Sequence, residues 1–233
     1  MSVIFGKKAL LDNIKNVQKV DLLPGRRDII TILDKHHISY TIHDEKWFDQ
    51  FDDNLNHQGI ISTLNNANKT VSLEEWLNKK LSQDIIVMID SIQDPQNFGS
   101  ILRTCDAFGV KTVIYKKDNQ VQVNDFVIKT SMGAISNLNL IRVTNLSNAL
   151  NQLKKSGYWI YASTLDDQSA NYAKVQYDQK SVIIVGSEEN GISPLLLKTA
   201  DFNVKIPMHG NVQSLNVAVA TGILLATIKV QLK

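Results

Sequence analysis

Residues 85–90 read Ile-Ile-Val-Met-Ile-Asp, and the polar stretch Ser-Ile-Gln-Asp-Pro-Gln-Asn-Phe-Gly follows at 91–99. The apolar run does not alternate with polar residues, which is typical of a strand covered on both faces of its sheet. Pro95 and its polar neighbours indicate a loop. Either Asp94 or Asn97 could then cap a helix at 99–108. The order strand, loop, helix predicts an α/β unit with a parallel sheet.

The same alternation continues to the end of the chain. Further apolar segments that predict strands lie at 112–115, 138–143, 158–163, 182–186 and 202–207. Helical periodicity falls between the strands, at 99–108, 125–132, 146–156, 193–200 and 215–230. These patterns predict a parallel-sheet α/β domain. The last helix is apolar nearly all round, so we expect it to be buried on more than one side, as a dimer interface would allow.

The first part of the chain has a more mixed and polar texture, which predicts a separate small α/β domain. Helical periodicity occurs at 4–14 and 27–36, and short strands are predicted at 38–42 and 59–63.

A polar connector joins the two regions. Within it, Ser72 and Glu75 have the spacing of a capping box, which predicts the start of a helix. We therefore expect a domain at 1–70, a linker at 71–83 and a second domain at 84–233.

Composition narrows the possible functions. The 233-residue chain is 43% apolar and 21% charged, which is ordinary for a globular protein. A net charge of +2 excludes a global basic field, so any contact with nucleic acid must use a local patch. The single Cys105 excludes an intramolecular disulfide, and the five histidines lack zinc-type spacing, so we expect no metal site. We also expect no signal peptide and no membrane span, and therefore a cytoplasmic protein.

Ligands of open parallel sheets bind outside the carboxyl ends of the strands. Three predicted strands end in polar loops, at 91–99, 187–191 and 208–216. We expect five side chains from these loops and the helices after them to share one cleft: Asn97, Arg103, Glu188, Ser214 and Asn216. Each loop taken alone leaves open the plainer interpretation of a turn or a capped helix. Asn216, a poor helix former, could work through its amide or cap the last helix.

Together the three loops resemble the three signature motifs of the SpoU (TrmH-like) family of SPOUT RNA methyltransferases. The first runs from Asp94-Pro95-Gln96-Asn97-Phe98-Gly99 through Arg103 to Val110, the second from Val185 to Gly191, and the third from Ile206-Pro207-Met208 through Ser214-Leu215-Asn216 into 217–220. The resemblance covers 84–233. In the first domain, 4–11 and His57-Gln58-Gly59-Ile60 resemble the ribosomal-protein L30e-like substrate-binding domain of the large-subunit rRNA members.

The resemblance implies a fold, a cofactor and an activity. The fold would be an α/β domain with a C-terminal trefoil knot, in a homodimer whose active sites draw on both subunits. The activity would be transfer of a methyl group from S-adenosyl-L-methionine (SAM) to a ribose 2′-hydroxyl of RNA, with a guanosine of 23S rRNA as the first expectation. Two alternatives stay open: a tRNA 2′-O-methyltransferase, and a non-catalytic RNA-binding factor of ribosome assembly.

The resemblance also implies roles for individual residues. Arg103 matches the family's catalytic arginine. Because arginine keeps its proton far above neutral pH, we expect it to bind an RNA phosphate and stabilise charge on the 2′-oxygen. Asn97, Glu188, Ser214 and Asn216 would complete the catalytic site. The cofactor would be bound by Thr164, Gly186, Ile206, Met208 and Leu215, and the candidates for RNA contacts are Lys7, Lys8, Arg26, Arg27, Lys129 and Arg142.

Overall fold

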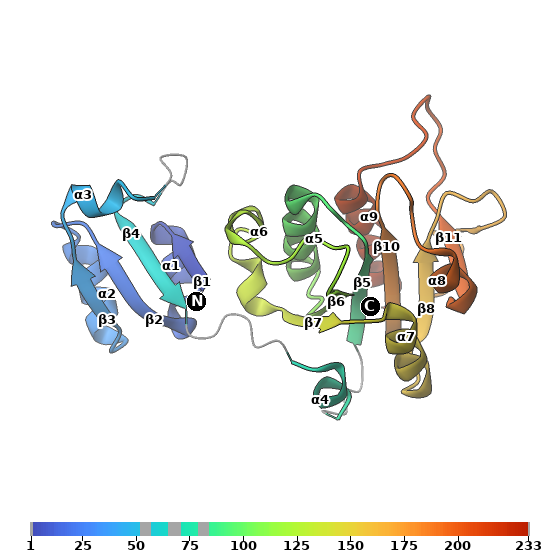
Figure 1. Cartoon of the computed structure of the whole chain (residues 1–233), viewed down its shortest axis with the longest axis horizontal. Coiled ribbons are helices and arrows are strands. Elements are labelled where there is room, and N and C mark those ends of the chain that lie inside the picture. Colours follow the sequence, from blue (N-terminus) through green and yellow to red (C-terminus); the bar gives the residue numbers. More distant parts are fainter. Residues whose placement is uncertain (1, 52–56, 65–70, 79–83, 233) are drawn as a thin grey trace. The chain divides into compact units, whose positions relative to one another are not determined.

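The computed structural model describes residues 2–51, 57–64, 71–78 and 84–232. The chain divides into two compact units, Met1–Lys69 and Thr70–Lys233, each of which has its own sheet (Figure 1). No helix in the described ranges combines the length and the apolar character that crossing a membrane would require.

The first unit packs short helices on a sheet with the strand order β1-β4-β2-β3. Strands β2 and β3 are parallel, and β4 runs antiparallel to both β1 and β2. Buried Ile, Leu and Val side chains form its core. Its elements are β1 (Ser2–Phe5), α1 (Lys7–Asp12), the 3-10 turn η1 (Ile14–Asn16), β2 (Val17–Leu22), α2 (Arg27–Lys35), β3 (Ser39–Ile42), α3 (Glu45–Phe48) and β4 (Ile60–Leu64).

The predicted helix at 4–14 is wrong in its first part. The chain begins with strand β1, in which Ile4 lies opposite Ser62 of β4, and α1 starts only at Lys7. Gly6 separates the two elements with a φ of 86°, which no helix interior allows. The prediction also lacks β2, whereas α2, β3 and β4 confirm the elements expected in their segments.

The second unit contains a parallel sheet with the strand order β7-β6-β5-β10-β8-β11-β9. The prediction of a parallel α/β domain is therefore confirmed. The short strand β9 was not predicted. The strands are β5 (Asp84–Asp90), β6 (Thr112–Lys116), β7 (Asn139–Val143), β8 (Trp159–Ser163), β9 (Ala170–Asn171), β10 (Lys180–Gly186) and β11 (Phe202–Lys205). Because β10 pairs with β5, the ends of these two strands lie side by side, with Gly186 opposite Asp90.

Helices cover both faces of this sheet (Figure 1). Ile85, Val87 and Ile89 of β5 pack in the core under α5, α6 and α9, whereas Ile86 and Met88 pack in the core under α4, α7 and α8. This two-sided burial explains the apolar run of β5. The helical elements are α4 (Leu73–Leu77), α5 (Pro95–Ala107), α6 (Asp125–Thr130), η2 (Ala134–Asn137), α7 (Leu146–Lys155), α8 (Pro194–Thr199) and α9 (Val217–Gln231).

Helix α4 lies within the range expected to be a linker, yet it packs as part of the second unit. Its predicted capping box is confirmed, with Ser72 and Glu75 bonded to each other's backbone N–H. Trp76 is 2% exposed, and its Nε1 donates to Thr112 Oγ1 at 3.1 Å.

Helix α5 begins earlier than the expected residue 99. Of the two possible caps, Asp94 is the one used: its Oδ1 accepts from the Gln96 N–H at 2.9 Å, and Pro95 occupies the first helical position. Arg103 therefore lies about two turns into the helix.

Cys105, near the end of α5, provides a test of this packing. Its side chain is fully buried, and burial raises the pKa of the thiol. Because the thiolate is the reactive form, the native protein should resist thiol-specific reagents at neutral pH. Labelling should become rapid and stoichiometric in denaturant, as followed by mass spectrometry. Rapid labelling without denaturant would mean that α5 does not pack on the sheet as described.

Candidate active site

The three polar loops meet through one hydrogen-bonded cluster. Asn216 Nδ2 donates to Asn97 Oδ1 at 2.8 Å and to Glu188 Oε1 at 3.0 Å. Asn97 Nδ2 donates to the same Glu188 oxygen at 3.2 Å. The three side chains come from α5, from the loop after β10 and from the start of α9. We call them the Asn–Glu–Asn cluster.

Asn216 combines both roles that the sequence left open. It is the N-cap of α9, and its Oδ1 accepts from the backbone N–H groups of Ala218 at 2.9 Å and Val219 at 3.4 Å. Because the amide oxygen faces the helix, the amide nitrogen faces Asn97 and Glu188. The cap therefore determines which way the donor of the cluster points.

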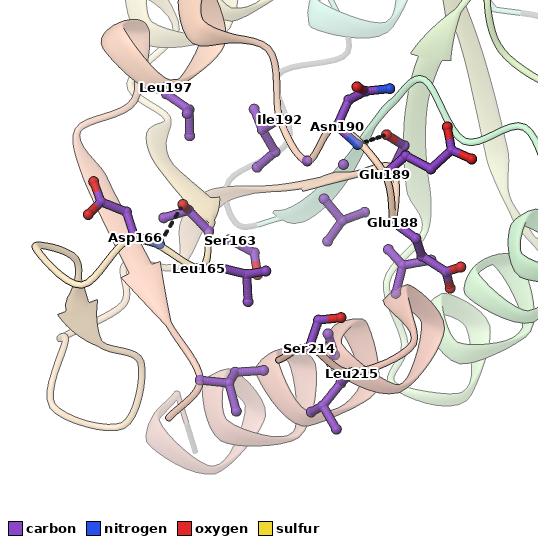
Figure 2. A pocket seen from close by; sticks show the side chains of 18 of the residues that line it. Ser163, Leu165, Asp166, Glu188, Glu189, Asn190, Ile192, Leu197, Ser214 and Leu215 are labelled. Carbon is purple, nitrogen blue, oxygen red and sulfur yellow. Dashed lines mark hydrogen bonds between the residues drawn. The ribbon is translucent and has the colours of Figure 1, made fainter. Parts of the chain in front are cut away.

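A pocket of about 360 Å³ lies beside this cluster at the carboxyl ends of β8 and β10. Figure 2 shows side chains around a common space, with Leu165 and Ile192 across from Ser214 and Leu215. All five residues expected to bind the cofactor line the pocket, as do Glu188 and Ser214. The lining is Ser163, Thr164, Leu165, Asp166, Val185, Gly186, Ser187, Glu188, Glu189, Asn190, Gly191, Ile192, Leu197, Ile206, Met208, Ser214, Leu215, Val217 and Ala220.

The pocket wall is apolar with an acidic component. Three carboxylates, those of Asp166, Glu188 and Glu189, belong to the lining, and no Lys, Arg or His does among the described residues. Sequence reasoning missed Leu165, Asp166 and Glu189. The first two directly follow Thr164, so the rule that ligands bind at strand ends could have found them.

A tight turn shapes the wall of the pocket after β10. The backbone N–H groups of Ser187 and Gly191 each donate to the other residue's carbonyl, at 3.1 and 2.9 Å. A Cβ at Gly186 would lie 2.2 Å from the carbonyl carbon of Gly191, which is far closer than any real contact. Glycine at 186 is therefore required for the loop to fold back on the strand.

Arg103 takes no part in the contacts that join the other expected catalytic residues. Its side chain is exposed and, among the described residues, forms no hydrogen bond or ion pair. Asn97, Glu188 and Asn216 bond to one another, and Glu188 and Ser214 line the pocket, whereas the Arg103 side chain does neither.

The six basic RNA candidates differ in their surroundings. Lys7 pairs with Asp28 at 2.6 Å, and Arg26 donates to the Gln58 carbonyl, so both are held within the first unit. Arg142 makes only a long contact of 3.4 Å to Gln122 Oε1. Lys8, Arg27 and Lys129 are exposed. Across the described parts of the chain, no three His, Cys, Asp or Glu side chains are grouped as a metal site requires.

The dual role of Asn216 can be separated by substitution. Asn216→Ala removes the cap of α9 and should lower the free energy of unfolding by about 1–2 kcal/mol. Asn216→Ser retains a capping oxygen and should remain within about 0.5 kcal/mol of the wild type. Urea denaturation measures both. Equal losses would show that the bonds to Asn97 and Glu188, rather than the cap, hold the start of α9.

Comparisons with known proteins show the family of the chain. The SpoU rRNA methylase family model matches residues 84–226, and a model for RNA 2′-O ribose methyltransferase substrate binding matches residues 3–70. A Mycoplasma pneumoniae protein described as an uncharacterised tRNA/rRNA methyltransferase is 41% identical over 231 residues, covering 96% of this chain and 95% of its own length.

Two solved structures extend the comparison. An AdoMet-bound rRNA methyltransferase from Sinorhizobium meliloti has a TM-score of 0.81 at 21% identity, covering 99% of this chain and 87% of that one. The A. aeolicus TrmH/SpoU tRNA modifying enzyme has a TM-score of 0.60 at 35% identity, covering 68% of this chain and 83% of that one. From its two matched domains and its close relatives, the chain belongs to the SpoU family of RNA methyltransferases.

Proposed function

We propose that this protein transfers a methyl group from SAM to a ribose 2′-hydroxyl of RNA. The observation that carries the proposal is the Asn–Glu–Asn cluster beside a pocket, because it joins the three family motifs in one place. A neighbour of the same fold is described as binding AdoMet, and the matched domain at 3–70 is described as a substrate-binding domain of 2′-O ribose methyltransferases.

The pocket suits SAM in size and in charge. Its volume of about 360 Å³ lies in the usual range for small-molecule sites. SAM carries positive charge on its sulfonium and its amino group, which the three carboxylates would favour. A cofactor bearing phosphates would be repelled by these carboxylates, and the described lining contains no cationic side chain to offset them. Thr164, Gly186, Ile206, Met208 and Leu215 would surround the adenosyl part, where an apolar slot is required.

The protein's contribution is orientation and charge stabilisation. SAM supplies an electrophilic methyl group, so no metal is needed to activate the donor. Asn97 and Glu188 would orient the ribose at the mouth of the pocket. Arg103 would bind the adjacent phosphate and stabilise negative charge as it develops on the 2′-oxygen, a role that donors of this kind fulfil in other enzymes.

A homodimer would bring Arg103 to a pocket. In one chain the arginine is exposed and outside the lining, so we propose that it serves the pocket of the second subunit. Val219 and Val230 of α9 are 51% and 72% exposed, which a subunit contact at this helix would cover. The C-terminal trefoil knot implied by the resemblance remains part of this proposal.

For the substrate, we propose a guanosine of 23S rRNA, as for the methyltransferase RlmB. The likeness to the S. meliloti rRNA methyltransferase fold spans 99% of the chain, whereas the likeness to the A. aeolicus tRNA enzyme spans 68%. The candidates for phosphate contacts remain four exposed basic residues, Lys8, Arg27, Lys129 and Arg142. We also propose that the protein acts in the cytoplasm. The intact Asn–Glu–Asn cluster favours catalysis over a purely RNA-binding role in ribosome assembly.

A methylation assay tests the activity and the substrate together. The protein is incubated with labelled SAM and with unmodified rRNA or tRNA, and the product is mapped by its resistance to alkaline cleavage. We expect one resistant bond, 3′ of a guanosine in 23S rRNA. Incorporation into tRNA alone would overturn the substrate and keep the chemistry. If neither RNA is labelled and the protein does not bind SAM, the alternative of a non-catalytic RNA-binding factor of ribosome assembly would replace the proposal.

The role of Arg103 has its own test. Arg103→Ala should lower kcat by about 10²–10³-fold, because one charge-stabilising donor is lost from the transition state. SAM affinity, measured by calorimetry, should stay at the wild-type value. Lys155→Ala serves as a control that removes an exposed basic side chain from the same unit and should retain most of kcat. Weaker SAM binding in Arg103→Ala would show that the arginine belongs to the cofactor site instead.

A further inference from the structure

Asp90 is a buried carboxylate whose partners lie in different parts of the second unit. It is the last residue of β5 and is 1% exposed. Its Oδ2 accepts from the backbone N–H of Ser193 at 2.8 Å. Its Oδ1 accepts from the Ser91 hydroxyl at 2.9 Å and pairs with Lys116 Nζ at 2.9 Å. One side chain thereby joins the ends of β5 and β6 to the start of α8.

The bond to Ser193 lies at the end of the pocket loop, residues 187–192. Every residue of this loop lines the pocket, including Glu188 of the Asn–Glu–Asn cluster. The other end of the loop is Gly186 of β10, which lies opposite Asp90 in the parallel register. Asp90 is therefore next to both ends of the pocket loop, to one through the sheet and to the other through its side chain.

The hydrogen bonds to the Asp90 carboxylate offset the free-energy cost of burying its charge. Burial by itself would raise the pKa of Asp90, but the hydrogen bonds from Lys116, Ser193 and Ser91 outweigh it, and the pKa is lowered. A buried carboxylate without such partners would be costly. The charged form is thus the one that holds the loop.

We propose that Asp90 is a positioning residue for the SAM pocket. By holding the Ser193 N–H, it keeps the pocket loop folded against the sheet, so that Glu188 meets Asn97 and Asn216. Asp90 itself is not among the residues that line the pocket. This inference rests on the proposed SAM-binding function, but its structural part, the anchoring of the loop, can be measured without the cofactor.

Two variants of Asp90 distinguish the loss of the acceptor for Ser193 from the loss of the negative charge alone. Asp90→Ala removes the acceptor for Ser193 and should weaken SAM binding about tenfold or more, since hydrogen bonds to charged groups are among the stronger ones. Asp90→Asn keeps an oxygen that can accept from Ser193 and should weaken binding by only about threefold. The kcat for methyl transfer should fall in the same order, because Glu188 loses its place.

Ser193→Pro tests the same bond from the donor side. Ser193 has a φ of −58° and a ψ of 143°, which proline can adopt, and its side chain does not cap α8. The substitution removes the N–H that Asp90 holds and leaves the carboxylate in place. It should reproduce the effect of Asp90→Ala on SAM binding, and it keeps the test available if Asp90→Ala does not fold.

Hydrogen exchange of the protein without SAM provides the second readout. Amides of residues 187–192 should exchange faster in Asp90→Ala and Ser193→Pro than in the wild type, with the rest of the sheet unchanged. Asp106→Asn is the matched control: it removes another lysine-paired carboxylate, 3.4 Å from Lys111 and outside the pocket lining, and should change neither readout.

The outcomes distinguish this inference from the proposed function. If the wild type binds SAM and all three variants bind it equally well with unchanged loop exchange, the positioning role is overturned. If the wild type itself fails to bind SAM, the proposed function is overturned, while faster loop exchange in the variants would still support the anchoring of the loop by Asp90.

Discussion

The parallel pairing of β5 with β10 is the constraint on which the active site depends. The two strands are distant in the chain, and Asp90 and Ser193, which bond across this junction, are 103 positions apart. Pairing in register places Gly186 opposite Asp90, so the loops after both strands leave the sheet at the same edge. Strand order is thus the reason that the first and second family motifs form one site.

The third motif joins through the start of α9. A helix N-terminus presents backbone N–H groups that need an acceptor, and Asn216 Oδ1 provides it. This orients the amide nitrogen of Asn216 toward Asn97 and Glu188. The capping of the helix therefore fixes the direction of the Asn216 amide nitrogen in the proposed catalytic site. An aspartate at this position could cap the helix but could not donate to Glu188.

The single chain supplies a cofactor-sized pocket and a polar cluster, but not the cationic group that the proposed reaction requires. The charged side chains of the described pocket lining are all negative, and Arg103 is exposed and not one of the lining residues. Under the proposed function, a second subunit would supply its Arg103 to complete the site.

The sequence by itself determined the parallel α/β class and the three polar strand-end loops, because apolar runs and loop residues are local signals. The five residues expected around the cofactor came from the resemblance to the family motifs, and all five line the pocket. It missed the N-terminal strand β1 and the early start of α5, where Gly6 and Asp94 set boundaries that periodicity does not show. Only the tertiary structure decided which atoms of Asn97, Glu188 and Asn216 bond to one another, that the Arg103 side chain does not join them, and that Asp90 accepts from the N–H of Ser193. These facts depend on strand order and helix placement, which arise from long-range packing and which no local pattern contains.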